Sequence, residues 1–250
     1  MTFRVFAHRG LNHQAPENTL SAFRLAAEQS VQWIETDVDV LADGTAIVIH
    51  DETLDRTTDL SGDYAHLTAT DLDPIDAGSW FSPEFAGEPL PTLDALVRLL
   101  NETGMHANIE LKGPTGGKQH AERLITQVTQ SLAALRPENQ VLISSFNHVL
   151  LARFKEQAPQ YPVACLFERH TFNSDWRTIA ELVGASAIHP EDDGLTAEQI
   201  AMMRDAGYDV NVWTVNSRAR INELKNFGAT GVFNDQANLM LDFEEDANVV

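Results

Sequence analysis

The sequence predicts an α/β protein with one domain, a (β/α)8 barrel of the TIM type that carries a small insertion after its second strand region. Two observations indicate this fold. Eight short apolar runs recur along the 250 residues, and segments of helix length separate most of them. In a chain of this size, such alternation is typical of a parallel barrel with its helices outside the strands. A doubly wound open sheet is the alternative, but the chain has no GxGxxG phosphate loop.

The expected strands and helices follow from apolar runs and from capping residues. Strands are expected at residues 4–7, 33–40, 106–112, 140–145, 163–167, 186–189, 209–215 and 230–234. Helices are expected at residues 19–29 after an Asn18 cap, 93–101 after Thr92, 196–206 before Gly207 and 217–227 before Gly228, with a further helix that ends at Gly184.

A predicted hairpin interrupts the alternation after residue 40. The segment 42–45, ADGT, joins two apolar runs with no helix between them, and Asp-Gly between strands predicts a two-residue turn. In that register Ala42 pairs with Thr45, and Asp37 lies opposite His50.

Residues 52–90 form the second interruption. They are rich in Asp, Gly, Thr and Pro, show no clear strand pattern and are longer than an ordinary βα loop. We expect a small insertion that packs near one barrel face on Trp80, Phe81 and Phe85 and adds little to the barrel core. The acidic tail from Asp242 is expected to fray.

Composition and charge exclude several classes of protein. Acidic residues outnumber basic ones by 37 to 17, for a net charge of −20. Such a surface repels nucleic acid and anionic membranes, so we expect neither nucleic-acid binding nor stable membrane association. A single cysteine, Cys165, excludes internal disulfides, is expected in the core and fits the cytoplasm. The sequence shows neither a signal peptide nor an apolar stretch of about 20 residues.

Carboxylates gather on two expected strands. Side chains alternate along a strand, so the polar residues that share a face are Glu35, Asp37 and Asp39 on one strand and Asn108, Glu110 and Lys112 on the other. Clustered carboxylates are costly to bury unless a cation offsets their repulsion. Glu35, Asp37 and Glu110 form an oxygen-rich set for a hard cation such as Mg²⁺ or Ca²⁺, and Asp39, further along its strand, is the weaker candidate.

Two histidines are expected beside these carboxylates. His8 ends the first strand, and the hairpin returns His50 to the same edge. Imidazoles can act as general acid and base near neutral pH. Arg9 and Lys112 suit phosphoryl oxygens, or serve as salt-bridge partners of the carboxylates. The carboxyl-terminal rim is where barrel chemistry takes place.

An ordered set of motifs covers nearly the whole chain. The segments are HRG at 8–10, PENT at 16–19, ETDV at 35–38, HD at 50–51, RTT at 56–58, PLPTL at 89–93, IELK at 109–112, SSF at 144–146 and WTVN at 213–216. In these the chain resembles the glycerophosphodiester phosphodiesterases of the cytoplasmic bacterial type. The family usually ends its last strand with Thr-Asp, whereas Asn234-Asp235 stands here, which leaves the role of Asn234 open.

The resemblance implies metal-dependent hydrolysis of glycerophosphodiesters, such as glycerophosphocholine or glycerophosphoethanolamine, to glycerol 3-phosphate and an alcohol. The implied roles are metal binding by Glu35, Asp37 and Glu110, acid–base catalysis by His8 and His50, and phosphate binding by Arg9 and Lys112. The metal would be Mg²⁺ or Ca²⁺, with Mn²⁺ as a further option. Water or the glycerol 2-hydroxyl would be the nucleophile, and a homodimer is left open.

Several residues, and the function as a whole, allow a second interpretation. Glu17 is either a residue of the substrate site that orients Arg9 or a histidine, or only an acidic residue in the first turn of a helix. Trp213 is a substrate wall or a core residue. His189 is a minor candidate for the rim, and the remaining histidines are expected at the surface or in loops: His13, His66, His106, His120, His148 and His170. A lysophospholipase D or a phosphoinositide-type phosphodiesterase would need an apolar or membrane-facing rim, and a non-catalytic metabolite-binding barrel would lack one of the histidines or carboxylates.

Overall fold

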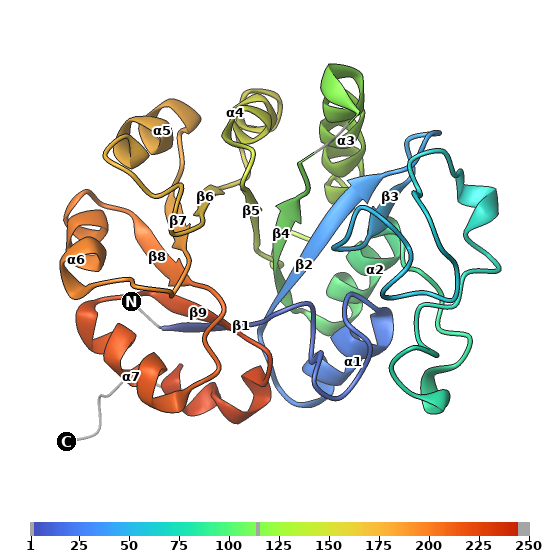
Figure 1. Cartoon of the computed structure of the whole chain (residues 1–250), viewed down its shortest axis with the longest axis horizontal. Helices are drawn as coiled ribbons and strands as arrows, with labels where there is room; N and C mark the ends of the chain where they lie inside the picture. The colour runs from blue at the N-terminus through green and yellow to red at the C-terminus, as the bar shows by residue number, and fades with distance from the viewer. Residues whose placement is uncertain (1–2, 114–115, 245–250) are drawn as a thin grey trace.

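The computed structural model describes residues 3–113 and 116–244 and contains a closed barrel of eight parallel strands. The barrel strands are β1 (Arg4–Ala7), β2 (Trp33–Val40), β4 (His106–Leu111), β5 (Val141–Ser145), β6 (Val163–Phe167), β7 (Ala187–Pro190), β8 (Asp209–Val212) and β9 (Gly231–Asn234). Their order is sequential, and pairing of β1 with both β2 and β9 closes the ring (Figure 1). The predicted (β/α)8 barrel is therefore confirmed.

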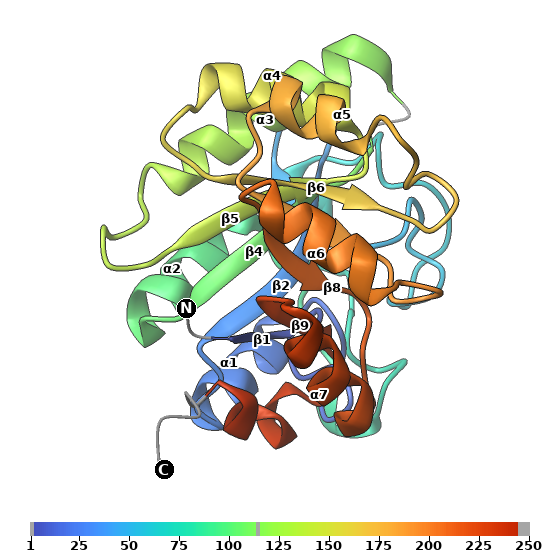
Figure 2. The same ribbon diagram turned by 90° about the vertical axis from the view of Figure 1, so that its left-hand side faces the viewer.

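Helices surround the strands on the outside (Figure 2). They are α1 (Leu20–Glu28), α2 (Leu93–Thr103), α3 (Gly117–Leu132), α4 (His148–Gln157), α5 (Trp176–Val183), α6 (Ala197–Asp205) and α7 (Arg218–Phe227), with short 3-10 turns η1 (Ala69–Asp71), η2 (Pro83–Phe85), η3 (Ala237–Leu239) and η4 (Leu241–Phe243). Thr92 caps α2, and left-handed Gly184 and Gly228 end α5 and α7, as predicted. Among the described residues, no helix is long and apolar enough to cross a membrane.

The expected Asn18 cap of α1 is wrong by one residue. The Thr19 side chain accepts the N–H of Ala22 and caps the helix. Asn18, with φ of +57°, instead directs its amide into the barrel, where it donates to Asp37 and accepts from the Thr36 hydroxyl. A long-range partner at the barrel rim therefore decides the role of Asn18.

The hairpin has a different register from the one predicted. β3 (Ala46–Val48) pairs antiparallel to β2 with Val38 opposite Val48. The Leu41 N–H donates to the Thr45 carbonyl, so the loop has three residues and ends at Gly44, which has φ of +97°. Asp-Gly suits this loop as well as a two-residue turn, because glycine takes the left-handed position in both. Asp37 is therefore not the strand partner of His50.

Residues 52–90 lie beside β2 and β3, as the cyan and teal segment at the right of Figure 1 shows. They build an apolar cluster of their own, separate from the main core, from Leu54, Tyr64, Leu72, Ile75, Ala77 and Leu90 together with Leu41, Ile47 and Ile49. The expected anchors Trp80, Phe81 and Phe85 are wrong. Trp80 is 39% exposed, and Phe81 contacts the rings of Trp80 and Phe85 edge to face near the surface. Aliphatic side chains facing β3 anchor the insertion instead.

Near the amino-terminal end of the barrel, residues from the start and the end of the described chain meet. Asp242 pairs with Arg218, and Glu244 accepts the backbone N–H of Val5, so the expected fraying from Asp242 is wrong up to residue 244. The rest of the expected tail, residues 245–250, lies outside the described residues. Cys165 is fully buried in the core, as predicted.

Candidate active site

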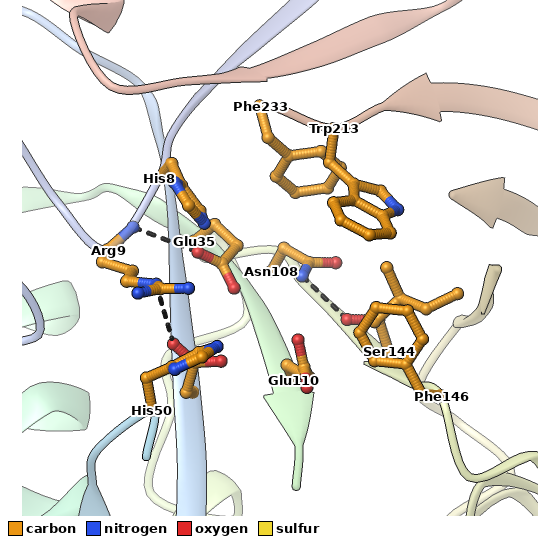
Figure 3. A pocket seen from close by; sticks show the side chains of 12 residues that line it. His8, Arg9, Glu35, His50, Asn108, Glu110, Ser144, Phe146, Trp213 and Phe233 are labelled. Atoms are coloured by element: carbon orange, nitrogen blue, oxygen red, sulfur yellow. Dashed lines mark hydrogen bonds and ion pairs between the residues drawn. The ribbon is translucent and has the colours of Figure 1, made fainter. Parts of the chain in front are cut away.

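A cavity of about 70 Å³ opens at the carboxyl-terminal side of the barrel strands (Figure 3). One side, which we call the charged wall, consists of His8, Arg9, Glu35, Asp37, His50 and Glu110. The other side, the neutral wall, consists of Asn108, Ser144, Phe146, Leu166, Trp213 and Phe233. The structure thus brings seven of the sequence-predicted site residues to one cavity, and Glu17 and Lys112 lie next to them.

Three carboxylates form the centre of the charged wall. One oxygen of each of Glu35, Asp37 and Glu110 lies within 4.8 Å of the others, and all three side chains are buried. The parallel register of β2 and β4 sets Asp37 beside Glu110. Burial and the neighbouring carboxylates raise the pKa of Glu35 well above its usual range and that of Glu110 to about 7.

Two cations partly compensate this charge. Lys112 Nζ lies 3.0 Å from Glu110 and 3.4 Å from Asp37, and Arg9 Nε lies 3.4 Å from Asp37. Burial alone would raise the pKa of Asp37, but Lys112 and Arg9 lower it below its usual value. The backbone N–H of Arg9 also donates to Glu35 over 3.0 Å. The salt-bridge contacts predicted for Arg9 and Lys112 are therefore present.

The donor set of this cluster fits a divalent cation. All three side chains offer oxygen, and one oxygen from each can approach a common point. When ionised, three carboxylates exceed the charge of Arg9 and Lys112 by at least one unit. A hard cation would remove the repulsion that raises the pKa of Glu35 and Glu110.

His8 is held by a carboxylate from the far end of the sequence. Its Nδ1 lies 2.8 Å from Asp235, which also accepts from Asn12 over 2.7 Å and from Asn216 over 2.6 Å. Burial would raise the pKa of Asp235, but the hydrogen bonds from His8 and Asn12 hold it well below its usual range. An ionised carboxylate only accepts, so the proton of neutral His8 is on Nδ1 and its Nε2 is left as the basic atom.

His50 has a matching arrangement. Its Nδ1 lies 2.6 Å from Asp51, and Arg56 donates to both Asp51 oxygens over 2.7 and 2.9 Å. Burial lowers the pKa of His50, and the negative charge of Asp37 partly opposes this effect. Sequence reasoning noted Asp51 and Arg56 only within motifs and assigned no role to Asp235. The available signals for Asp235 were its position after the last strand and its match to the Asp of the family's Thr-Asp pair.

Glu17 lies between the two arginines. It accepts from Arg9 over 2.8 Å and from Arg56 over 2.7 and 2.8 Å. It does not line the cavity. Of the predicted alternatives, these contacts favour a residue that orients Arg9 over one that is only a first-turn acid of a helix.

Two further histidines lie outside the carboxylate cluster, and His120 differs from its expected place. His189 does not face the rim: it is fully buried inside the barrel, with Nε2 3.0 Å from Asn211, and burial lowers its pKa to about 3. His120 is not a free surface residue, because its Nε2 lies 2.6 Å from Asp39. Asp39 also accepts from Tyr64, so it belongs to the insertion side of β2 and not to the carboxylate cluster.

The segment after β8 carries Trp213 of the neutral wall. β8 ends at Val212, so Trp213 lies beyond the strand that was expected to reach residue 215. Its ring meets Phe146 edge to face at 5.4 Å, and its Nε1 donates to the His189 carbonyl. Asn234, whose role the sequence left open, is fully buried and donates to the Val215 carbonyl over 2.6 Å. It thereby holds this segment against the end of β9.

Comparisons with known proteins agree over almost the whole chain. A model of the glycerophosphoryl diester phosphodiesterase family matches residues 8–239. A glycerophosphodiester phosphodiesterase of Caldanaerobacter subterraneus is 31% identical over 237 residues, which cover 95% of this chain and 96% of the relative. One from Bacillus subtilis is 32% identical over 247 residues, covering 93% and 83%. A solved structure of an Oleispira antarctica phosphodiesterase in complex with the product sn-glycerol-3-phosphate has a TM-score of 0.91 at 31% identity, and the match covers 97% of this chain and 96% of that one.

Proposed function

The chain belongs to the glycerophosphoryl diester phosphodiesterase family, and on this premise we propose that it hydrolyses glycerophosphodiesters to glycerol 3-phosphate and an alcohol with the help of a divalent cation. One observation carries the proposal. A single cavity joins three clustered carboxylates to two histidines, each backed by its own carboxylate. The relative from Oleispira antarctica, whose fold matches throughout, binds the same product.

Glu35, Asp37 and Glu110 would hold the cation, Mg²⁺, Ca²⁺ or Mn²⁺. When bound, it would supply positive charge to a phosphoryl oxygen and so stabilise the charge that develops in the transition state. Arg9 and Lys112 would bind the remaining phosphoryl oxygens. Their ammonium and guanidinium groups already lie at the carboxylates, so they need little movement to reach a bound phosphate.

Proton transfer would be the work of His8 and His50. One Nε2 takes the proton of the attacking water or of the glycerol 2-hydroxyl, and the other gives a proton to the departing alcohol. Attack by the 2-hydroxyl would give a cyclic phosphate, and water would then open this ring to form glycerol 3-phosphate. Asp235 and Asp51 keep the two rings oriented, and each stabilises its imidazole when that becomes cationic. Glu17 holds Arg9 for its contact with phosphate.

The test is an assay for glycerol 3-phosphate released from glycerophosphocholine and glycerophosphoethanolamine. We expect turnover with Mg²⁺, Ca²⁺ or Mn²⁺ and its loss in chelator, with restoration when the metal is returned. Full activity of protein verified to be metal-free would contradict the cation requirement. The absence of product from both diesters with every metal would contradict the proposed function itself. The same proposal includes a cytoplasmic location, in keeping with the single buried Cys165.

A further inference from the structure

One buried polar atom on the neutral wall has no partner. Asn108 is 1% exposed, and its Nδ2 donates to the Ser144 hydroxyl oxygen over 2.9 Å, but its Oδ1 makes no hydrogen bond within the described chain. Figure 3 shows the amide oxygen turned into the cavity, toward the space beside Trp213 and Ser144. A buried carbonyl without a partner is unfavourable, so this atom points to a ligand that donates to it.

Ser144 completes a matched pair of hydrogen-bonding groups. It is fully buried, and its oxygen accepts from Asn108, so its hydroxyl hydrogen remains available to a ligand. The pair therefore presents one acceptor and one donor. If the Asn108 amide were flipped, its oxygen would accept from the Ser144 hydroxyl, and its N–H would be free to donate. The pair would still offer a ligand one donor and one acceptor. A hydroxyl group is the ligand chemistry that donates and accepts at a single oxygen.

The surroundings select an uncharged carbon skeleton for that hydroxyl. The rest of the neutral wall is Phe146, Leu166, Trp213 and Phe233, which offer apolar surface and no charge. Asn108 precedes Glu110 by two residues on β4, so it lies about 6–7 Å further from the rim along the strand than Glu110 and level with Glu35 of β2. A group that reaches Asn108 while its phosphate stays near Asp37 and Glu110 must therefore extend from phosphorus into the barrel.

On these grounds we propose that Asn108 and Ser144 bind the terminal hydroxyl of the glycerol unit and so determine which phosphodiesters are accepted. The inference rests on the proposed function and names the part of the substrate that the neutral wall recognises. The hydroxyl next to the phosphate ester is one carbon closer to phosphorus, so the terminal hydroxyl is the one that extends further into the barrel. Removing the terminal hydroxyl leaves Asn108 unpaired, and acylating it, as in a lysophospholipid, removes the proton that it would donate to Asn108.

The experiment uses three choline phosphodiesters and measures kcat/KM from choline release. The first contains glycerol, the second 1,2-propanediol, which lacks the terminal hydroxyl, and the third 1,3-propanediol, which lacks the central one. We expect the wild-type enzyme to prefer the glycerol ester over the 1,2-propanediol ester by on the order of 10–100-fold, as sites that pair a buried hydroxyl do.

Asn108→Ala is expected to reduce that preference to within about threefold, because kcat/KM should fall on the glycerol and 1,3-propanediol esters, which carry the terminal hydroxyl, and not on the 1,2-propanediol ester. Its preference over the 1,3-propanediol ester should be unchanged. Ser144→Ala should act in the same direction with a smaller effect. Ser145→Ala is the matched control: Ser145 is the next residue, equally buried, but its hydroxyl donates to the Leu111 carbonyl, so both preferences should stay at the wild-type value.

Calorimetry of product binding gives a readout independent of turnover. The wild-type protein should bind glycerol 3-phosphate more tightly than 1,2-propanediol 1-phosphate, and Asn108→Ala should remove most of the difference. A wild-type enzyme that does not discriminate between the two, or an Asn108 variant that weakens all three substrates equally, overturns the inference. If no diester is hydrolysed, the proposed function fails. Calorimetry with the two phosphates then still tests whether Asn108 binds the terminal hydroxyl. Thermal unfolding of each variant identifies loss of fold, and Ser144→Ala then supplies the test.

Discussion

The charged wall of the cavity is held together by ion pairs, whereas the neutral wall is built from packed rings and one amide–hydroxyl pair. On the charged wall, Arg9 reaches both Asp37 and Glu17, and Glu17 continues to Arg56. On the neutral wall, Trp213 and Phe146 contact each other, and Asn108 bonds Ser144. The two walls therefore suit different tasks: the first can stabilise charge and move protons, and the second can read the shape and hydroxyl pattern of a substrate.

The walls also differ in how far their groups are satisfied without a ligand. The carboxylates repel one another, and the pKa of Glu110 rises to about 7 as a result of burial and that repulsion. The neutral wall has a single unpaired atom, the Asn108 oxygen, in the described chain. We therefore expect changes in the charged wall to reduce turnover by orders of magnitude, changes in the neutral wall to alter selectivity, and changes beneath the walls to alter stability.

Removing a carboxylate of the charged wall should have the largest effect. Glu35→Gln or Glu110→Gln takes away an anionic oxygen and should weaken cation binding and reduce kcat on the order of 10³-fold or more. Isothermal calorimetry with Mg²⁺, Ca²⁺ or Mn²⁺ and the glycerol 3-phosphate assay measure the two quantities. Asp39→Asn is the control on the same strand, because Asp39 bonds Tyr64 and His120 instead. Wild-type cation affinity in both Gln variants would contradict the assignment.

Loss of either histidine should come next. His8→Ala and His50→Ala should each lower kcat by about 10²–10⁴, as removal of an acid or base does. A glycerol diester with a nitrophenyl leaving group needs little protonation on departure, so the variant that lacks the acid should recover rate with it, and the other should not.

This histidine comparison requires the glycerol unit in both substrates, since its 2-hydroxyl is one of the two candidate nucleophiles. Near-wild-type turnover of glycerophosphocholine by both single variants would rule out the acid–base assignment. If the nitrophenyl diester restored the rate of both variants to the same degree, His8 and His50 would still be catalytic, but one could not be assigned as the acid and the other as the base.

The carboxylates behind the histidines should have a smaller effect. Asp235→Asn and Asp51→Asn remove the acceptor that orients each imidazole, and such partners typically contribute about 10–100-fold. Because neither carboxylate is proposed to touch substrate, kcat should fall while KM is nearly constant, and the pH profile of kcat should move. Asp209→Asn, an acidic residue near the opposite end of the barrel, is a control that should leave kcat unchanged. An increase in KM alone would argue against an orienting role.

A change beneath the neutral wall should affect stability and its pH dependence. His189 has a folded-state pKa of about 3, because burial disfavours its charged form, against about 6.5 in an unfolded chain. Below pH 6.5 the unfolded state binds a proton that the folded state does not, so stability falls as pH decreases toward 3. Between pH 7 and pH 5 this linkage amounts to about 2 kcal/mol.

His189→Gln removes that linkage. In urea denaturation, the variant should lose less free energy of unfolding between pH 7 and pH 5 than the wild-type protein, whatever its stability at pH 7. Equal losses in the two proteins would show that His189 does not remain neutral in the folded state.

The sequence alone determined most of the barrel and the chemical composition of the charged wall. Strand periodicity placed Glu35 and Asp37 on one face, and the expected β1 and β2 have the bounds that the structure shows. Caps such as Thr92 and Gly228 also act where they were predicted. These features depend on neighbours within a few residues, where backbone preference and side-chain alternation decide the outcome.

Only the tertiary structure decided which distant groups meet. Asp235 bonds His8 because β9 pairs with β1 and closes the ring, and no local pattern encodes that contact. The hairpin register was missed for a related reason: the same Asp-Gly permits two loops, and packing against the insertion selects one of them. The unpaired oxygen of Asn108 likewise depends on what the folded barrel does and does not place within hydrogen-bonding distance. Pairings across the chain follow from closure of the barrel and burial of its surfaces, which are properties of the whole fold rather than of any one segment.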